Sequence, residues 1–321
     1  MIHLRIVAPP AKAETVVALL CETDSVCNVI RLSDPSRRPD GTVILCDVAR
    51  EDASVVISDL KDMDLHHEGS ITLELIDTAI SDVAERAEQH ARGAPADAVV
   101  WEEVEAKTSE QVELSGAFLM FMVLAALLAA VGIYLDSPIL IVGAMVVGPE
   151  FGPIAGVCVA LIQSRRELAR TSAIALAVGF PLAIAAGYLA TVVFRATGVM
   201  DATFDQEEHS IATVIASPDF LAFFVAACAG AAGMLSLSTS KSGALIGVLI
   251  SVTTIPAAAN IGVTAAYRDW ESWRGSMAQL AINLLGILIA GTATLAIQRM
   301  LYVRRRRKHR HEPARAAAGL R

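Results

Sequence analysis

The chain has 321 residues, of which 54% are hydrophobic and only 19% are charged, and its mean hydropathy is +0.53. This composition excludes a disordered chain and argues against an ordinary soluble enzyme. The net charge of −8 is unevenly divided, because residues 1–113 hold 10 Lys and Arg against 23 Asp and Glu, whereas residues 114–321 hold 16 against 11. The acidic first part argues against nucleic-acid binding, which needs a basic surface.

Residues 1–77 predict a small α+β domain. Ile2, Leu4 and Ile6 alternate with polar residues, which is the period of a half-buried strand. Comparable patterns predict strands at 26–32, 42–48 and 70–76, and helices at 11–22 and 51–63. The order β-α-β-β-α-β is that of a ferredoxin-like domain. Because the segment shows no phosphate loop or ligand motif, a packing or assembly role is favoured over ligand binding.

Residues 78–113 predict a polar helical linker followed by a juxtamembrane helix. Asp97 is a suitable N-cap for that helix. Several carboxylates follow, among them Glu102 and Glu103. They are interpreted as a solvated face rather than as a cation site.

Residues 114–301 predict a domain of six membrane-spanning helices. Each apolar stretch is close to the ~20 residues that a helix needs to cross the hydrocarbon of a bilayer. Because backbone polar groups must be satisfied internally in lipid, we expect these stretches to be helical. A basic tail follows at 302–321. The six stretches lie at 115–135, 138–162, 171–194, 218–236, 243–265 and 277–300.

Lys and Arg residues set the predicted orientation. With both termini on one side, the loops and tail on that side hold 13 Lys and Arg, and the other side holds only Arg195, Arg268 and Arg274. The positive-inside rule then predicts a multi-pass protein of the bacterial inner membrane with both termini in the cytoplasm. The run RRRRKHR after the last span is interpreted first as a topological anchor and second as a site for anionic lipid headgroups.

The second span, SPILIVGAMVVGPEFGPIAG, differs from a plain anchor helix. Gly148 precedes Pro149, and Gly152 precedes Pro153. Each proline removes a backbone donor and clashes with the preceding turn, so we expect the helix to open there. Glu150 stands between the two prolines. A carboxylate near the bilayer centre costs about 2.5 kcal/mol or more, so Glu150 is expected to face the interior of the helix bundle.

The fifth span contains a comparable interruption and is also expected to open. When the fifth span is aligned with the second at an offset of 104 residues, Thr254 corresponds to Glu150, and Pro256 falls next to the position of Pro153. Each interrupted span is the middle helix of a group of three, so the second group would run inverted relative to the first. Paired interrupted helices in inverted halves are typical of a transporter site near the membrane midplane. The residues of interest in the fifth span are Ser251, Thr253, Thr254, Pro256 and Asn260.

Helix packing is the alternative interpretation of these small residues. Gly148, Gly152 and Gly156 also fit the small-xxx-small spacing by which helices associate in lipid. The glycines alone favour packing. When the two prolines and Glu150 are also considered, packing and a functional break are equally well supported. Asn283 in the sixth span is interpreted either as a hydrogen-bonding residue between helices or as a ligand contact.

The sequence contains no recognisable catalytic or cofactor motif. All seven histidines lie outside the predicted spans, and neither a zinc-protease motif nor a phosphate-binding loop occurs. The five cysteines form no CxxC pair and are interpreted as small buried hydrophobic residues. We therefore expect no enzymatic activity, no cofactor and no metal site.

The second span resembles the signature of a prokaryotic membrane-protein family catalogued as domain of unknown function 389. Relatives carry the pattern I-G-A-M-hydrophobic-S-P-hydrophobic-M-G-P-I, where this chain has Gly148 in place of the serine and Glu150 after the proline. The resemblance covers about residues 115–265, and the acidic version is similar to actinobacterial members. It implies a multi-span inner-membrane protein but no established activity, and it does not imply Glu150 as a family-wide residue.

Two functions are carried forward as hypotheses. The first is a small secondary transporter or channel-like permease for a small solute or ion. The second is a membrane-anchored sensor or scaffold that acts through the acidic N-terminal domain. Expected partners are the lipid bilayer, the solute and a second copy of the chain, but no nucleic acid. The candidate pathway residues are Gly148, Pro149, Glu150, Gly152, Pro153, Ser251, Thr253, Thr254, Pro256, Asn260 and Asn283.

Overall fold

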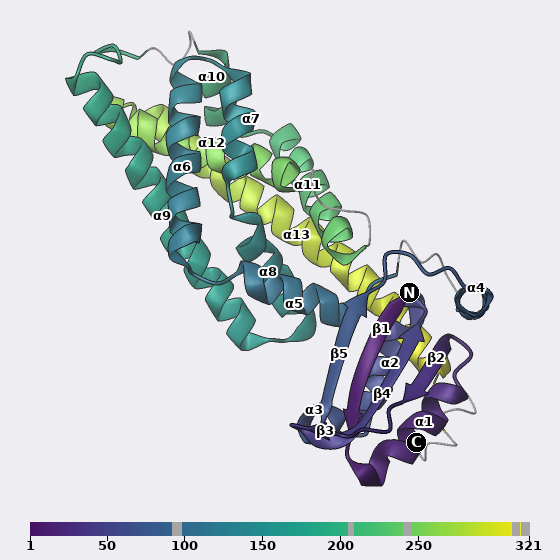
Figure 1. Cartoon of the computed structure of the whole chain (residues 1–321). Helices are drawn as coiled ribbons and strands as arrows, with labels where there is room; N and C mark the ends of the chain where they lie inside the picture. Colours follow the sequence, from purple (N-terminus) through teal and green to yellow (C-terminus); the bar gives the residue numbers. More distant parts are fainter. Residues whose placement is uncertain (92–97, 205–208, 240–245, 310–314, 316–321) are drawn as a thin grey trace. The chain divides into compact units, whose positions relative to one another are not determined.

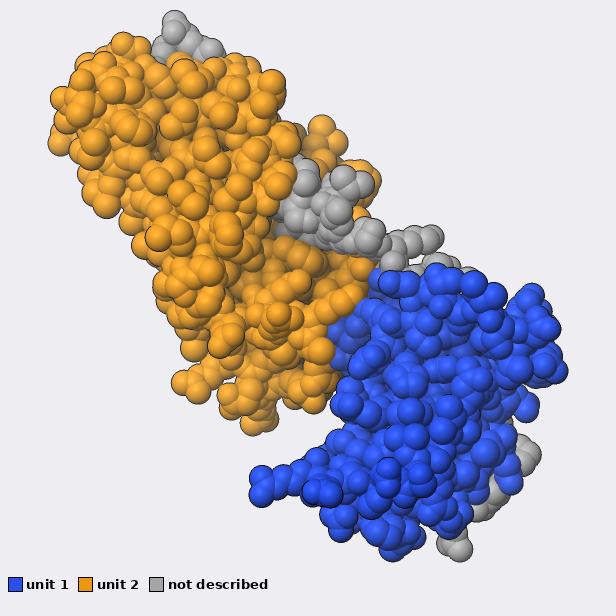
Figure 2. Space-filling model, in the orientation of Figure 1, with its two compact units in different colours: residues 1–104, 238–241, 298–321 blue, residues 105–237, 242–297 orange. Residues whose placement is uncertain are grey.

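A computed structural model describes residues 1–91, 98–204, 209–239, 246–309 and 315, without the side chains of residues 246–253 and 308 (Figure 1). The chain forms two compact units (Figure 2). Unit 1 comprises residues 1–104, 238–241 and 298–321, and unit 2 comprises residues 105–237 and 242–297.

Unit 1 is built on an antiparallel sheet. The strand order is β2-β4-β1-β5, and the short β3 pairs with β4. Leu4 in the central strand lies opposite Cys46 on one side and Leu73 on the other. The strands are β1 (Ile2–Ala8), β2 (Val26–Arg31), β3 (Ser36–Arg37), β4 (Asp40–Val48) and β5 (Ser70–Leu75).

Helices of unit 1 pack on this sheet and close one hydrophobic core. Ile2, Leu4 and Ile6 are fully buried in it, which confirms the alternation predicted for the first strand. The main elements keep the predicted order β-α-β-β-α-β, and the short β3 lies between the strands predicted at 26–32 and 42–48. The helices are α1 (Pro10–Cys21), α2 (Arg50–Asp62), α3 (Leu65–Glu68) and α4 (Asp82–His90).

Helix α5 (Trp101–Gln111) corresponds to the predicted juxtamembrane helix, whose N-cap candidate Asp97 lies outside the described residues. The prediction of a solvated acidic face is wrong at its first turn. Glu103 is only 9% exposed and accepts a hydrogen bond of 2.9 Å from Arg50. Glu102 accepts from Lys61, also at 2.9 Å. The reason is that a carboxylate can be buried when it is hydrogen-bonded, and α2 supplies the donors.

The last turns of α13 (Trp270–His309) belong to unit 1 and contact α2 there. Asp59, which is fully buried, receives one of these contacts. The basic run therefore has acidic partners within unit 1, which its predicted roles as an anchor and as a lipid-headgroup site did not include. The contacts are Arg305 with Asp52 at 3.3 Å, Arg306 with Asp62 at 3.1 Å, and His309 with Asp59 at 2.9 Å.

Glu51 in the first turn of α2 makes the stability of unit 1 depend on pH. Burial raises the pKa of Glu51 above its ordinary value, and the nearby guanidinium of Arg305 offsets this only in part. A raised pKa in the folded state means that folding favours the protonated form. This contribution to stability is complete below the unfolded pKa of about 4.3, and it is lost as the pH rises through the folded pKa.

We expect Glu51→Gln to stabilise unit 1 at pH 7 and to have no stabilising effect at pH 4, where the wild-type carboxyl is largely protonated. Hydrogen exchange of the β1 amides in the full chain, corrected for the intrinsic effect of pH, measures this difference. Glu74→Gln on the exposed side of β5 is the control. An equal gain at both pH values would contradict the assignment.

Unit 2 consists of helices. Four of them, α6, α9, α11 and α13, are long and apolar enough to cross a membrane, and α7 with α8 makes a fifth if the bent pair is one span. Within the described residues, the six predicted spans are therefore not confirmed; α12 occupies the predicted fifth span. The helices before α13 are α6 (Gly116–Tyr134), α7 (Pro138–Val147), α8 (Phe151–Gln163), α9 (Arg166–Ala196), α10 (Ser210–Ala216), α11 (Phe220–Ser238) and α12 (Ile246–Tyr267).

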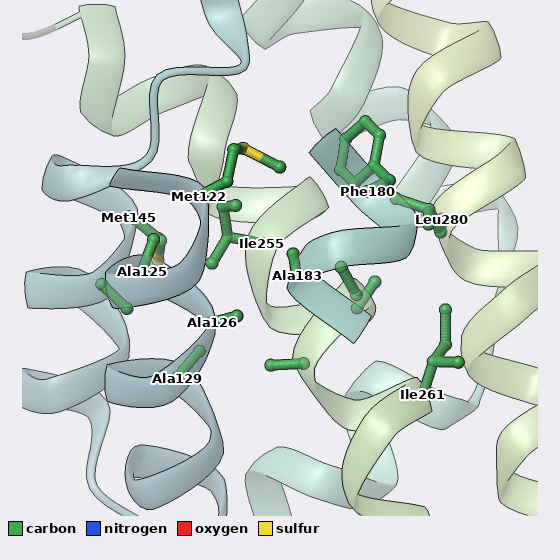
Figure 3. Close-up of a cluster of buried hydrophobic side chains, with 14 of the residues drawn as sticks. Met122, Ala125, Ala126, Ala129, Met145, Phe180, Ala183, Ile255, Ile261 and Leu280 are labelled. Carbon is green, nitrogen blue, oxygen red and sulfur yellow. The ribbon is translucent and has the colours of Figure 1, made fainter. Parts of the chain in front are cut away.

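Small side chains let α6, α9 and α12 approach closely. Ala125, Ala126 and Ala129 of α6 are fully buried in one cluster with Ala183 of α9 and Ile255 of α12 (Figure 3). In lipid, helices associate through such close packing because the hydrophobic effect does not drive them together. The centre of unit 2 is accordingly a tightly packed bundle.

The two halves of unit 2 have matching helix boundaries. Helix α11 begins and ends 104 residues after α6, α12 ends 104 residues after α8, and α13 begins 104 residues after α9. The turns match as well, because Ser164 and Arg268 both have a positive φ, of 58° and 61°. In both halves the residue that follows this positive-φ residue donates its backbone N–H, at 3.0 Å, to the carbonyl oxygen of the residue five positions before it.

Candidate functional site

The second predicted span is broken between α7 and α8. The two helices are bent by 53° relative to each other, which confirms the predicted opening at Gly148 and Pro149. Pro149 has no N–H, so the carbonyl of Met145 lacks its helical donor. Pro153 lies in the first turn of α8, where a missing N–H removes no intrahelical bond. The two prolines thus end one helix and allow the next to begin.

Glu150 lies at this break and has no exposed surface. It is the N-cap residue of α8, where the positive end of the helix dipole favours a negative charge. Its Oε1 accepts a hydrogen bond of 2.8 Å from Oγ1 of Thr254, which is also fully buried. Two predicted site residues, one from each half of unit 2, are thereby brought together.

The prediction that the fifth span also opens is wrong. Helix α12 is continuous with Pro256 inside it. A single proline removes one backbone donor, and membrane helices tolerate this because neighbouring groups satisfy the freed carbonyl. The break at Glu150 instead combines two prolines four residues apart, each preceded by glycine. The side chains of Ser251 and Thr253 lie outside the described residues.

The other predicted residues lie on α12 and α13. Asn260 Nδ2 donates to Ser276 Oγ at 2.9 Å, and Gln279 Nε2 donates to Asn283 Oδ1 at 3.4 Å. All four side chains are buried. Sequence reasoning missed Ser276 and Gln279. A signal was available, because Gln279 and Asn283 follow Ser276 by three and seven residues, which places all three on one face of a helix.

Gly152 and Gly156 lie at close helix contacts, as the packing interpretation expects. A methyl group at Gly152 would lie 2.7 Å from the carbonyl oxygen of Gln111. One at Gly156 would overlap Ser172 Oγ and lie 2.5 Å from Val112. These two glycines therefore have a packing reason that does not depend on a solute.

Contacts between the two halves of unit 2 are reciprocal. Cys158 of α8 lies 3.8 Å from the carbonyl oxygen of Leu288 in α13. Gly262 of α12 lies 104 residues after Cys158, and Ile184 of α9 lies 104 residues before Leu288. These two residues are also close, because a methyl group at Gly262 would lie 2.6 Å from the carbonyl oxygen of Ile184. Glu150 and Thr254 are themselves 104 residues apart.

Residues 145–289, which include the break, Glu150, Thr254 and the polar face of α13, match the family described as Domain of unknown function (DUF389). These residues form a DUF389 domain. The family resemblance inferred from the second span is confirmed, whereas the likeness to actinobacterial members stays a prediction.

The chain is also similar to an uncharacterised protein of Methanocaldococcus jannaschii. The two are 24% identical over 194 residues, which are 59% of this chain and 56% of that protein. The chain thus spans about half the length of the curated relative that it matches. No solved structure matches this chain.

Proposed function

We propose that this chain is a small secondary transporter or channel-like permease of the bacterial inner membrane, with both termini in the cytoplasm. Its solute path would pass Glu150 and Thr254. The observation that carries the proposal is the hydrogen bond of 2.8 Å between these buried side chains at a broken helix. A carboxylate among membrane helices is costly, and such residues mark ion or substrate paths by default.

The matching halves support an inverted repeat. Reciprocal contacts, in which one residue pair reappears with its members exchanged between halves, are what a two-fold axis produces. Each half has three spans if α7 and α8 count as one and α12 is included, so the second half would cross the membrane in the opposite sense. Glu150 and Thr254 occupy matching positions and touch, so the axis would pass between them. Transporter sites typically lie at such a repeat interface.

Access to the pair requires a second conformation, because neither Glu150 nor Thr254 has exposed surface. A transporter alternates between such closed and open arrangements, whereas a packed structural core stays closed. This difference can be measured with a thiol at position 254, since cysteine is close to threonine in size.

We expect a chain whose only cysteine comes from Thr254→Cys to react with a small water-soluble thiol reagent from at least one side of the membrane. The reaction should be at least about tenfold faster than that of the matched variant Ala126→Cys, which places a thiol in the buried alanine cluster of α6. Equal, very slow labelling at both positions would count against a solute path at Glu150.

A membrane-anchored sensor or scaffold is kept as the second candidate because α2 of unit 1 holds the end of α13 through three acidic side chains. Deleting residues 1–77 separates the two functions. Under the transport proposal, solute flux in reconstituted vesicles should largely survive the deletion. Under the sensor proposal, every cellular phenotype of the protein should vanish with it.

A further inference from the structure

A second group of buried polar side chains lies on α12 and α13. It consists of Asn260, Ser276, Gln279 and Asn283, none of which is more than 9% exposed. The spacing of three and seven residues places the last three on one face of α13. The hydrogen bond of 2.9 Å from Asn260 to Ser276 holds Asn260 against that face.

Two amide oxygens in this group, Asn260 Oδ1 and Gln279 Oε1, have no hydrogen-bond partner among the described residues. Reversing the amide of Gln279 alone would place its oxygen opposite the acceptor oxygen of Asn283, which is now 3.4 Å from Gln279 Nε2. A buried acceptor without a donor is destabilising. An electropositive ligand in contact with both oxygens would satisfy them.

The matching positions of the first half contain no such group. They are Gly156, Ser172, Ala175 and Gly179, each 104 residues earlier. Gly156 packs against Ser172 so closely that no side chain fits there, and Ala175 belongs to the hydrophobic cluster. The amide oxygens are therefore specific to the second half and are not needed to pack the helix pair.

We propose that Asn260, Ser276, Gln279 and Asn283 bind one monovalent alkali cation, with the amide oxygens of Asn260 and Gln279 as its principal ligands. Hard cations prefer oxygen ligands. This ligand set is neutral, so it favours a single charge over the double charge of Mg²⁺ or Ca²⁺. The inference rests on the proposed function, in which the bound cation would be the coupling ion.

Binding of radioactive Na⁺ and of K⁺ to the purified full chain in detergent tests the proposal. One of the two cations should raise the thermal midpoint relative to choline at equal ionic strength. Gln279→Leu should weaken its binding about tenfold or more, which corresponds to about 1.4 kcal/mol. Ser172→Ala, which removes the matching hydroxyl of the first half, should leave binding unchanged.

Equal midpoints in sodium, potassium and choline salts for the wild-type chain would overturn the proposal, as would wild-type affinity in Gln279→Leu. If Gln279→Leu does not fold, Gln279→Glu decides: it should bind the cation more tightly at neutral pH and lose that gain in acid, whereas a structural role predicts no cation-specific change. Cation binding without any solute flux would remove only the transport proposal. Glu150-dependent flux without cation binding would remove only this inference.

Discussion

Glu150→Gln is expected to lower solute flux about 100-fold, towards the background of protein-free vesicles. The amide has the size of the carboxyl, and its oxygen can still accept the hydrogen bond from Thr254. What it loses is the ability to ionise and to exchange a proton, and positioned groups of this kind contribute about 100-fold or more in related proton-transfer steps. Flux is measured in reconstituted vesicles with a panel of small solutes and with a pH-sensitive dye.

The hydroxyl partner should have a smaller effect. Thr254→Val removes one hydrogen bond to the carboxyl group but leaves that group in place, so flux should fall about tenfold. Thr191→Val is the matched control, because Thr191 is also fully buried but donates only to a carbonyl of its own helix, Gly187, at 2.8 Å. If the wild-type chain and Glu150→Gln gave the same background flux for every solute, the path at Glu150 would be refuted.

Gly262→Ala is expected to destabilise unit 2 by about 3 kcal/mol, at the upper end of the usual effect of overpacking. The added methyl group would lie 2.6 Å from the carbonyl oxygen of Ile184 and 2.7 Å from the backbone nitrogen of Tyr188. Both are backbone atoms, so no side-chain rotation can relieve the contact. The helices α9 and α12 would have to move apart along the alanine-rich contact.

Gly143→Ala is the control for this substitution. It adds the same methyl group to a helix of the same unit, where among the described residues no atom outside the local helix backbone lies within 4 Å. Because alanine also favours helix over glycine, its thermal midpoint should equal or exceed that of the wild-type chain. The midpoint of the monodisperse protein in detergent is the measurement, and an equal loss for both variants would show that the contact at Gly262 is not the cause.

The sequence was most informative where a local pattern determines the structure. The alternation of Ile2, Leu4 and Ile6 predicts a strand, and the paired prolines around Glu150 predict a broken helix; both follow from backbone chemistry within a few residues. Pro256 was misinterpreted because the effect of a single proline depends on neighbouring helices, which local pattern does not reveal.

The rest of the candidate site depends on contacts between distant residues. The offset of 104 aligned Thr254 with Glu150, but it did not reveal that the two side chains touch. Gln279 was missed because a single polar residue in an apolar stretch becomes informative only when the facing helix is known. Glu103 was misassigned for the same reason, since its partner Arg50 is 53 residues away.

The acidic contacts at the end of α13 change how its basic run can act. Arg305 and Arg306 lie beside Asp52 and Asp62, so the chain supplies counterions to its own arginines. An anionic headgroup that approached them would have to displace carboxylates rather than water. A count of positive residues therefore overstates the attraction of this segment to acidic phospholipid.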